Sequence, residues 1–538
     1  MKKILSMALL LSMLLTSVLY GCKQSNGGDA NETTENKAPQ AEFKCETWVV
    51  ESFEKVVGEK DKPNGTTTDI ELHMSKNEKE GFNVVVKSEN AAEGLKLELI
   101  EGATDGISVE YLETYLIPCG SRYSYPDPIV PSDGTFSVEA GISKSILVRF
   151  ETTADTEAGD YVFKFALNDP NGKRVQEYTV TLTVWNITLP ENVTTESAIG
   201  ISVDYMLHKE KVPGRLKEKY YVAYYEMLLD YGLTAYGLPY DILNEKADKY
   251  MSDPRVTSFK VPHNVSDEKL AQYYEKLSTN KEWMDKAYFY PFDEPTTTEH
   301  LNEIKSICSR LKTLCPEINI MIPFFVNTKY DANNDEVDVL SEYVGTWCPK
   351  SACWNESFMA NPLGRPSFGD RMLEEKEDGD KLWWYVCWEP GPPYNNLYVN
   401  EPGLDHIKLF WQQYDAGVEG FLYWSSTYWC YVDDPWKDMA TVQGWLSDSV
   451  FGDGSLFYPG RNVGIEGPVA SLRLDCIRNG IEDIELLKLA EEKLGKAWVD
   501  EQLDNVTKSV TNHTKKNNVY NETRIAIGEA LEAALNNN

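Results

Sequence analysis

The chain has 538 residues, 42% of them hydrophobic, and a formal net charge of −33. Its length predicts about three to four domains, and its hydrophobic content is ordinary for globular cores. A surface this acidic repels phosphate backbones and no basic cluster interrupts it, so we expect no nucleic-acid partner and little binding of anionic polymers. The sequence predicts neither a protein partner nor a cofactor.

Residues 1–22 have the features of a bacterial lipoprotein signal peptide. Two lysines precede an apolar run too short for a lasting membrane span, which ends at Leu19, Tyr20, Gly21 and Cys22. Cys22 is the predicted lipidation site, although Tyr20 stands where a small residue is usual. Residues 23–42 are polar and predict a flexible tether. We therefore expect a lipoprotein on the extracellular face of the bacterial cell membrane, attached only by its N-terminal lipid anchor.

Residues 43–190 predict an all-β sandwich. Apolar side chains alternate with polar ones in short runs, as at Leu95, Leu97 and Leu99, and turn signals such as Asn171-Gly172 separate the runs. The stretch YPDPIVP is interrupted by prolines and is more aromatic than a plain turn. We interpret it as a loop that contacts the next domain; a less favoured alternative is that it reaches a ligand.

Residues 191–452 predict a (β/α)8 barrel of the TIM type, because apolar runs alternate with amphipathic helical segments. The segment contains eight candidate strands, and eight strands close such a barrel. In these barrels the chemistry takes place at the C-terminal ends of the strands. The predicted strands are 198–204, 233–238, 255–260, 286–292, 318–326, 343–348, 381–388 and 419–425.

Asp293 and Glu294 directly follow the fourth predicted strand. Beyond the end of a strand the chain turns, so two adjacent side chains can both reach the barrel mouth, and Pro295 enforces that turn. Thr296 and Glu299 match the spacing of a capping box, which predicts a helix start close to the two acids. The alternative interpretation is that the pair only caps this helix.

Aromatic residues cluster in the second half of the predicted barrel, where ten of the fourteen tryptophans lie between Trp347 and Trp445. Barrel interiors prefer branched aliphatic residues, so aromatic rings at strand ends indicate a flat-walled pocket that could stack on sugar rings. Carboxylates beside such a pocket are the arrangement expected of a glycosidase. The predicted substrate-binding residues are Trp347, Trp384, Tyr385, Trp388, Tyr423 and Trp424.

Five motifs carry a family resemblance: YPFDEP, WWYVCWEPGPP, GFLYWSSTYW, GDGSLFYPG and SLRLDCIRNGIEDIELL, in this order. Together they resemble glycoside hydrolase family 123 and the associated domain of unknown function 4091. The YPDPIVP stretch and the preceding segment resemble the N-terminal domain of that family. The resemblance implies a retaining β-N-acetylgalactosaminidase without a cofactor, whose catalytic pair is Asp293 and Glu294.

The implied mechanism uses the substrate as its own nucleophile. The 2-acetamido oxygen attacks the anomeric carbon and forms an oxazolinium ion, while Asp293 orients the amide and stabilises its charge. Glu294 protonates the leaving oxygen and later activates water. This requires a raised pKa at Glu294 and a low one at Asp293.

Two alternatives to this mechanism stay open. Glu389 ends the seventh predicted strand, so Glu294 as acid/base and Glu389 as nucleophile could form a conventional two-carboxylate retaining glycosidase. The other alternative is a surface lipoprotein that binds glycans on an inactive barrel, because a fold alone does not establish activity.

The remaining signals favour structural roles. Asp331, Asn333, Asp335 and Glu342 stand at calcium-loop positions, but Glu336 replaces the required glycine, so we predict no metal site. Cys308 and Cys315 lie on the apolar face of a predicted helix and are expected in the core. Residues 453–538 predict a helical extension, fastened to the barrel by Arg473, Arg478, Glu482 and Asp483.

Overall fold

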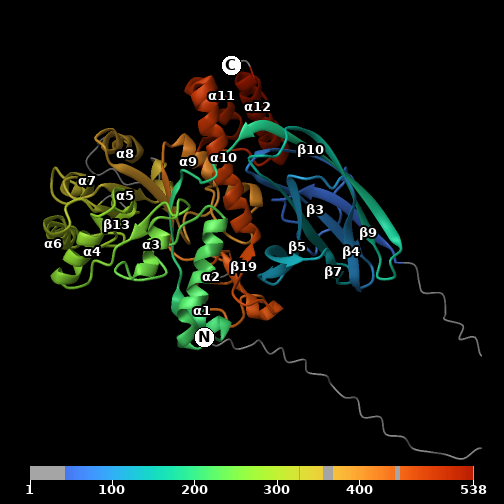
Figure 1. The fold of residues 1–538 in the computed structure, drawn as a ribbon, viewed down its shortest axis with the longest axis horizontal. Helices are drawn as coiled ribbons and strands as arrows, with labels where there is room; N and C mark the ends of the chain where they lie inside the picture. Colours follow the sequence, from blue (N-terminus) through green and yellow to red (C-terminus); the bar gives the residue numbers. More distant parts are fainter. Residues whose placement is uncertain (1–42, 326–327, 356–366, 443–448, 537–538) are drawn as a thin grey trace, which may run out of the picture. The chain divides into compact units, whose positions relative to one another are not determined.

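A computed structural model describes residues 43–325, 328–355, 367–442 and 449–536 (Figure 1). The predicted signal peptide, the lipidation site at Cys22 and the tether lie outside the described residues, so these expectations stay predictions. From Lys44 onwards the chain forms one closely packed unit. None of the helices in the described part of the chain is both long and apolar enough to cross a bilayer.

The N-terminal region contains two sheets that are antiparallel apart from the parallel pairing of β10 with β2. The first sheet runs in the order β1 (Cys45–Glu51), β3 (Lys79–Ser88), β8 (Ser143–Thr152), β5 (Ile107–Cys119), β6 (Tyr123–Ser132), β19 (Pro468–Ser471) and β18 (Phe457–Pro459). The second sheet runs in the order β2 (Asp69–Lys76), β10 (Arg174–Thr188), β9 (Gly159–Asn168), β4 (Ala92–Glu101) and β7 (Thr135–Val138).

The two sheets contact each other through aromatic side chains. Phe82 of β3 lies 5.5 Å from Phe165 of β9, and Phe150 of β8 lies 4.8 Å from Phe163 of β9, measured between ring centroids. All four rings are fully buried. The alternation of apolar residues seen in the sequence therefore fills the space between two sheet faces.

The YPDPIVP stretch is a strand and not the expected loop. It belongs to β6, which pairs with β5 on one side and briefly with β19 on the other. Each proline removes a backbone donor from the strand. The pairing of β5 with β6 shifts register between Thr114 and Leu116, which accommodates this loss. The strand pairing therefore forms despite the local turn signal. Asp127 in this strand is fully buried and accepts hydrogen bonds from Tyr458 and Arg473. These two contacts go to the predicted C-terminal extension, whereas the expectation was a contact with the next domain.

The third sheet is a nearly closed parallel barrel. Its order is β11 (Glu196–Ile199), β17 (Gly420–Tyr423), β16 (Lys381–Val386), β15 (Thr346–Pro349), β14 (Asn319–Phe324), β13 (Ala287–Phe289) and β12 (Phe259–Lys260). Residues 234–236 lie between β11 and β12, because Ile199 N donates to Thr234 O at 2.8 Å and Lys260 N donates to Tyr236 O at 2.7 Å. Each of the eight predicted strand ranges overlaps one of these segments.

Helices alternate with the barrel strands and share a buried core with them. Phe289, Ile322 and Phe421 of the strands pack in one cluster with Ile304 and Phe410 of the helices. The helices of this region are α1 (Val203–Glu210), η1 (Gly214–Leu216), α2 (Lys217–Asp230), α3 (Glu245–Met251), α4 (Asp267–Leu277), α5 (Lys281–Lys286), α6 (Thr298–Leu314), α7 (Glu336–Leu340), η2 (Ser351–Trp354), α8 (Phe368–Glu377) and α9 (Gly403–Asp415).

The C-terminal end is helical, as expected, but it begins with the two strands β18 and β19 that join the first N-terminal sheet. Helix α10 then packs beside α9, α11 and α12 and also contacts β6 (Figure 1). The remaining elements are η4 (Gly460–Val463), α10 (Leu472–Leu494), α11 (Lys496–Val506), β20 (Thr507–Ser509), β21 (Asn512–His513) and α12 (Asn517–Asn536).

The charged residues of α10 were expected to fasten it to the barrel, and they also contact the N-terminal sheets and the C-terminal helices. Arg473 donates to Asp127 of β6 and also to the backbone oxygens of Leu397 and Gly452. Asp483 accepts from Trp411 of α9 and from Tyr520 and Arg524 of α12. Helix α10 therefore links the N-terminal sheets, the barrel helices and the C-terminal helices.

Most of the cysteines are core residues: six of the nine are buried, and Cys45, Cys119 and Cys430 are partly buried. The nine cysteines from Cys45 to Cys476 are free thiols. Cys308 and Cys315 are buried in the same cluster as Leu301, Ile304 and Leu311, as the helical spacing predicted.

Candidate active site

Asp293 and Glu294 lie just beyond the C-terminal end of β13, in the turn that leads to α6. Helix α6 begins at Thr298, and its N-cap is Thr297, whose Oγ1 accepts a hydrogen bond from His300 N at 3.2 Å. The expected cap at Thr296 is therefore wrong by one residue. The side chain of His300 accepts from Thr296 N, the residue before the cap, at 3.2 Å and not from the N-cap itself, so the pattern differs from a capping box.

Glu294 has an unusual backbone and a half-buried side chain. Its φ of 45° lies in the left-handed region, which is uncommon for a residue other than glycine and clusters at functional sites. Oε1 of Glu294 accepts a hydrogen bond from the hydroxyl of Tyr385, a residue of β16, which is separated from β13 in the sheet by β14 and β15. Tyr385 is one of the aromatic residues predicted to bind substrate, and this contact places it at one of the two acids.

Burial raises the pKa of Glu294 above its ordinary value. The hydrogen bond from Tyr385 and the charge of Lys350 act against this rise, and the charges of Asp293 and Glu389 add to it. The direction of this shift is the one that a general acid requires near neutral pH.

Asp293 is exposed and oriented by a tyrosine. The hydroxyl of Tyr290, three residues earlier, donates to Asp293 Oδ1 at 2.7 Å. Burial raises the pKa of Tyr290 well above its ordinary value, so this hydroxyl stays protonated and keeps donating. The bond from Tyr290 uses Oδ1 and not Oδ2 of Asp293.

Lys350 brings a positive charge close to the acids. It follows β15 directly, and only 3% of its side chain is exposed. Its Nζ lies 3.6 Å from Glu389 Oε2, 4.8 Å from the ring centroid of Phe325 and 5.9 Å from that of Trp388. Sequence reasoning missed Lys350 and Tyr290; a lone lysine after an apolar strand and a tyrosine three residues before Asp293 were the available signals.

Three of the predicted aromatic residues lie in the core and not on a pocket wall. Trp347, Trp384 and Tyr423 are completely buried, and they pack in the cluster shared by strands and helices. Trp347 Nε1 donates to Asp380 at 2.8 Å and Trp384 Nε1 donates to Gln413 at 3.1 Å. Adjacent side chains of a strand point to opposite faces, so these residues face the helices while their neighbours face the barrel interior.

The other three predicted aromatic residues are nearer to the barrel interior and its mouth. Tyr385 packs in the interior cluster with Tyr288, Trp383 and Leu422, and Trp424 packs against that cluster. Trp388 is 39% exposed beside Lys350. Tyr385 therefore contacts Glu294 directly. Trp388 contacts Lys350, whose charge acts on Glu294.

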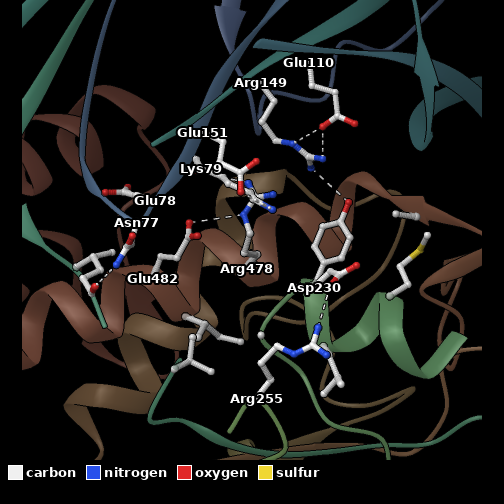
Figure 2. Close-up of a pocket in the computed structure, with 18 of the residues that line it drawn as sticks. Asn77, Glu78, Lys79, Glu110, Arg149, Glu151, Asp230, Arg255, Arg478 and Glu482 are labelled. Atoms are coloured by element: carbon white, nitrogen blue, oxygen red, sulfur yellow. Dashed lines mark hydrogen bonds and ion pairs between the residues drawn. The ribbon is translucent and has the colours of Figure 1, made fainter. Parts of the chain in front are cut away.

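A cavity of about 800 Å³ lies away from the two acids, among β3, β5, β8, α2 and α10 (Figure 2). Its charged residues are largely paired with each other. Arg149 contacts Glu110 and Asp475, Arg255 contacts Asp230, and Arg478 contacts Glu482. Such pairs hold packed elements together, so we attribute this cavity to the junction of the N-terminal sheets with α2 and α10 and not to the acids' chemistry.

Among the described residues, no group of three or more His, Cys, Asp or Glu side chains could hold a metal ion. Asp335 of the calcium-like stretch is the N-cap of α7 and accepts from Arg371 Nη2 at 3.0 Å.

Comparison with known proteins gives a consistent result. Residues 223–490 match the family model "Glycoside hydrolase 123, catalytic domain". A family 123 glycoside hydrolase from Clostridium perfringens, described as acting on glycolipid glycans, shares the fold with a TM-score of 0.66 and 12% identity; the match covers 92% of this chain and 98% of that one. A putative β-galactosidase from Bacteroides fragilis is 10% identical with a TM-score of 0.26, over 65% of this chain and 53% of that one, which is too distant for an argument. No curated protein sequence matches significantly.

Proposed function

Because this chain belongs to glycoside hydrolase family 123 and is a glycosidase, we propose that it releases N-acetyl-β-galactosamine, or a related 2-acetamido-2-deoxy-β-hexose, from glycans. The observation that carries the proposal is the adjacent pair at the end of β13, in which Tyr290 orients Asp293 and Tyr385 contacts the half-buried Glu294. The glycan named for the Clostridium perfringens relative makes glycolipid glycans one substrate class to test.

In the proposed reaction the substrate's acetamido oxygen forms a bond to the anomeric carbon while the glycosidic bond breaks. Asp293 accepts a hydrogen bond from the amide N–H and stabilises the positive charge that develops on the oxazolinium ring. Glu294 gives its proton to the leaving oxygen, and the resulting carboxylate then takes a proton from the water that opens the ring. The acetamido oxygen attacks the face of the anomeric carbon opposite the leaving group, and water later attacks from the face that the leaving group left, so two inversions retain the configuration.

Two adjacent carboxylates suit this reaction better than a direct displacement. In a conventional retaining glycosidase the nucleophile and the acid stand on opposite sides of the bond, about 5–5.5 Å apart. Glu389 is the alternative nucleophile, and its ion pair with Lys350 gives it a structural explanation as well. The two-carboxylate mechanism is therefore kept as an outcome of the tests below.

The first test compares aryl glycosides of N-acetyl-β-galactosamine, N-acetyl-β-glucosamine and β-galactose. The N-acetylgalactosaminide should be cleaved fastest and the plain galactoside should be inert, because it lacks the internal nucleophile. Efficient cleavage of the plain galactoside would exclude the mechanism. Binding without turnover of any glycoside would indicate the non-catalytic alternative.

The second test separates the two carboxylates by the leaving group. Glu294→Gln should lose roughly 10² to 10⁴ in rate on a natural glycoside, and much less on an aryl glycoside with an acidic phenol that needs no proton. Asp293→Asn should slow both substrates alike, by about 10² to 10³, because its loss falls on charge stabilisation. Equal leaving-group dependence of the two variants would contradict the assigned roles.

The finer architecture is part of the proposal. We infer a complete (β/α)8 barrel for residues 191–452, supported by residues 234–236, which hydrogen-bond to both β11 and β12. A β-sandwich for residues 43–190 is supported by the phenylalanine contacts between the two sheets. Residues 453–538 then form the C-terminal extension.

Attachment to the outer face of the cell membrane through Cys22 is likewise a proposal, which rests on the N-terminal sequence. Cys22→Ala should release the full-length protein from the membrane fraction. A variant that stayed membrane-bound would show a different mode of attachment.

A further inference from the structure

A second cavity, of about 530 Å³, lies at the C-terminal ends of the first barrel segments. It is lined by residues that follow β11, by Gly237 to Ile242 after the segment 234–236, and by Lys260 at the end of β12. The next strand in the ring is β13, which leads to Asp293 and Glu294. The cavity therefore opens on the same end of the barrel as the proposed catalytic pair.

One tyrosine connects the cavity to the acids. Lys260 Nζ lies 5.8 Å from the ring centroid of Tyr290 and 5.2 Å from that of Tyr236, and these two rings are in edge contact at 5.9 Å. The hydroxyl of Tyr290 is the group that donates to Asp293. A saccharide with one sugar at the acids could therefore place a neighbouring sugar near Lys260.

The charges of this cavity differ from those of the whole chain. Lys260, Arg215 and Lys217 line it, and none of the three makes an ion pair or a side-chain hydrogen bond with another described residue. Lys260 is half-buried, and burial lowers its pKa because no carboxylate offsets the lost hydration. The neighbouring tyrosine rings attract an ammonium group without neutralising it.

The two acids that line the cavity are already engaged by lysines outside its lining. Glu218 pairs with Lys246 at 2.9 Å. Asp241 accepts from Tyr273 at 2.8 Å and pairs with Lys269 at 3.4 Å. The cavity thus offers three unpaired cations in a chain with a net charge of −33. Charges farther away than about 8 Å are largely screened at physiological ionic strength, so the local cations dominate here.

We propose that this cavity binds an anionic substituent, a carboxylate or a sulfate ester, on the sugar next to the one that is cleaved. Lys260 contacts the anion, Arg215 and Lys217 supply the outer charge, and the ring of Tyr240 lines the cavity beside the sugar. This inference rests on the proposed function for the position of the cleaved sugar. It narrows the substrate class to acidic glycans that carry a 2-acetamido sugar at their end.

The test uses a matched pair of disaccharides, N-acetyl-β-galactosaminyl-glucuronic acid and the same compound with its carboxylate converted to the methyl ester. A second pair joins N-acetylgalactosamine to galactose with and without a 6-sulfate, which separates sulfate from carboxylate recognition. Dissociation constants are measured by calorimetry in the Glu294→Gln background, where turnover does not interfere, and kcat/KM is measured for the otherwise unchanged protein.

We expect an anionic member of a pair to bind at least about tenfold more tightly than its neutral partner at low salt, and the ratio to fall as salt is added. Lys260→Met should bring the ratio close to one, and Arg215→Gln with Lys217→Gln should reduce it in part. Those two residues are exposed, so their variants test the proposal even if Lys260→Met does not fold. Lys281→Met, at an exposed lysine outside the cavity, should leave the ratio unchanged.

The proposal would be overturned if both anionic compounds bound with the same affinity as their neutral partners. It would also be overturned if Lys260→Met weakened the binding of the anionic and the neutral member of a pair by the same factor. The calorimetric ratio does not depend on catalysis. If no N-acetylhexosaminide is cleaved but the ratio and its loss in Lys260→Met persist, the proposed reaction fails and the anion site stands.

Discussion

The carboxyl of Glu294 is influenced by neighbours that act in opposite directions. Burial raises its pKa, whereas the hydroxyl of Tyr385 lowers it by donating to the ionised form. A general acid has to hold its proton at the working pH and also release it to the leaving oxygen. The tyrosine therefore limits how strongly burial retains the proton.

Tyr385→Phe should move the basic limb of the kcat profile to higher pH. Without the donated hydrogen bond the ionised form of Glu294 is less stable, so its pKa rises further and the acid stays protonated to a higher pH. The measurement is kcat against pH on a glycoside with a poor leaving group. Tyr290→Phe is the control, since its hydroxyl contacts Asp293 and its loss should reduce the rate without moving this limb. A limb that moved to lower pH in Tyr385→Phe would contradict the assignment.

Lys350 and Glu389 should shift the same limb in opposite directions. The charge of Lys350 lowers the pKa of Glu294 and that of Glu389 raises it. Lys350→Met should therefore move the basic limb up, and Glu389→Gln should move it down while the enzyme stays active. If Glu389→Gln is instead inactive and a 2-fluoro sugar becomes attached to Glu389, the two-carboxylate mechanism is correct.

At the level of single elements, the start of α6 is one place where the structure and the sequence pattern differ. The spacing of Thr296 and Glu299 indicated the cap, but Thr297 is the residue with extended backbone before the first helical turn. Its hydroxyl satisfies His300 N, one of the helix's unpaired donors. This cap also fixes the end of the turn that carries the two acids.

Thr297→Ala should destabilise the protein by about 1 kcal/mol, the usual cost of losing an N-cap side chain. Thr296→Ala is the matched control and should have a smaller effect, because alanine keeps the backbone N–H bond to His300 Nδ1 and loses only the longer contact of the hydroxyl with the same nitrogen, at 3.5 Å. Urea denaturation of both variants measures the difference. A larger loss of stability in Thr296→Ala than in Thr297→Ala would indicate that Thr296 is the N-cap, as the sequence predicted.

The barrel strands show what sequence patterns can and cannot predict. The order of the strands and the position of the acids after β13 follow from apolar runs and their spacing. The apolar runs do not indicate which of the alternate residues face inward. In β16, Tyr385 faces the interior while Trp384 packs against Gln413 of α9. That choice depends on contacts with a helix 29 residues away. Lys350 and Lys260 were missed for a similar reason, since a lone lysine carries no periodic signal.

At the level of the whole molecule, the C-terminal segment connects parts that are distant in sequence. β18 and β19 extend the first N-terminal sheet, and α10 packs on α9. No local pattern predicted that two short strands after residue 453 would pair with a sheet formed more than 300 residues earlier. The pairing places β6, and with it Asp127, against Arg473 at the start of α10.

Asp127→Asn should therefore destabilise the entire protein, by about 3–5 kcal/mol, because it leaves the fully buried guanidinium of Arg473 without its partner. Asp127 accepts from Nε and Nη2 of Arg473 and from the hydroxyl of Tyr458, so its replacement disturbs the hydrogen bonds of three donors at once. Asp61→Asn is the matched control: Asp61 pairs with Lys87 at 2.7 Å but its side chain is 97% exposed, so no measurable change is expected. Guanidinium unfolding followed by tryptophan fluorescence and by circular dichroism should show both probes shifting together in Asp127→Asn. Loss of the N-terminal sheets alone, with the barrel transition unmoved, would show that this ion pair does not couple the two regions.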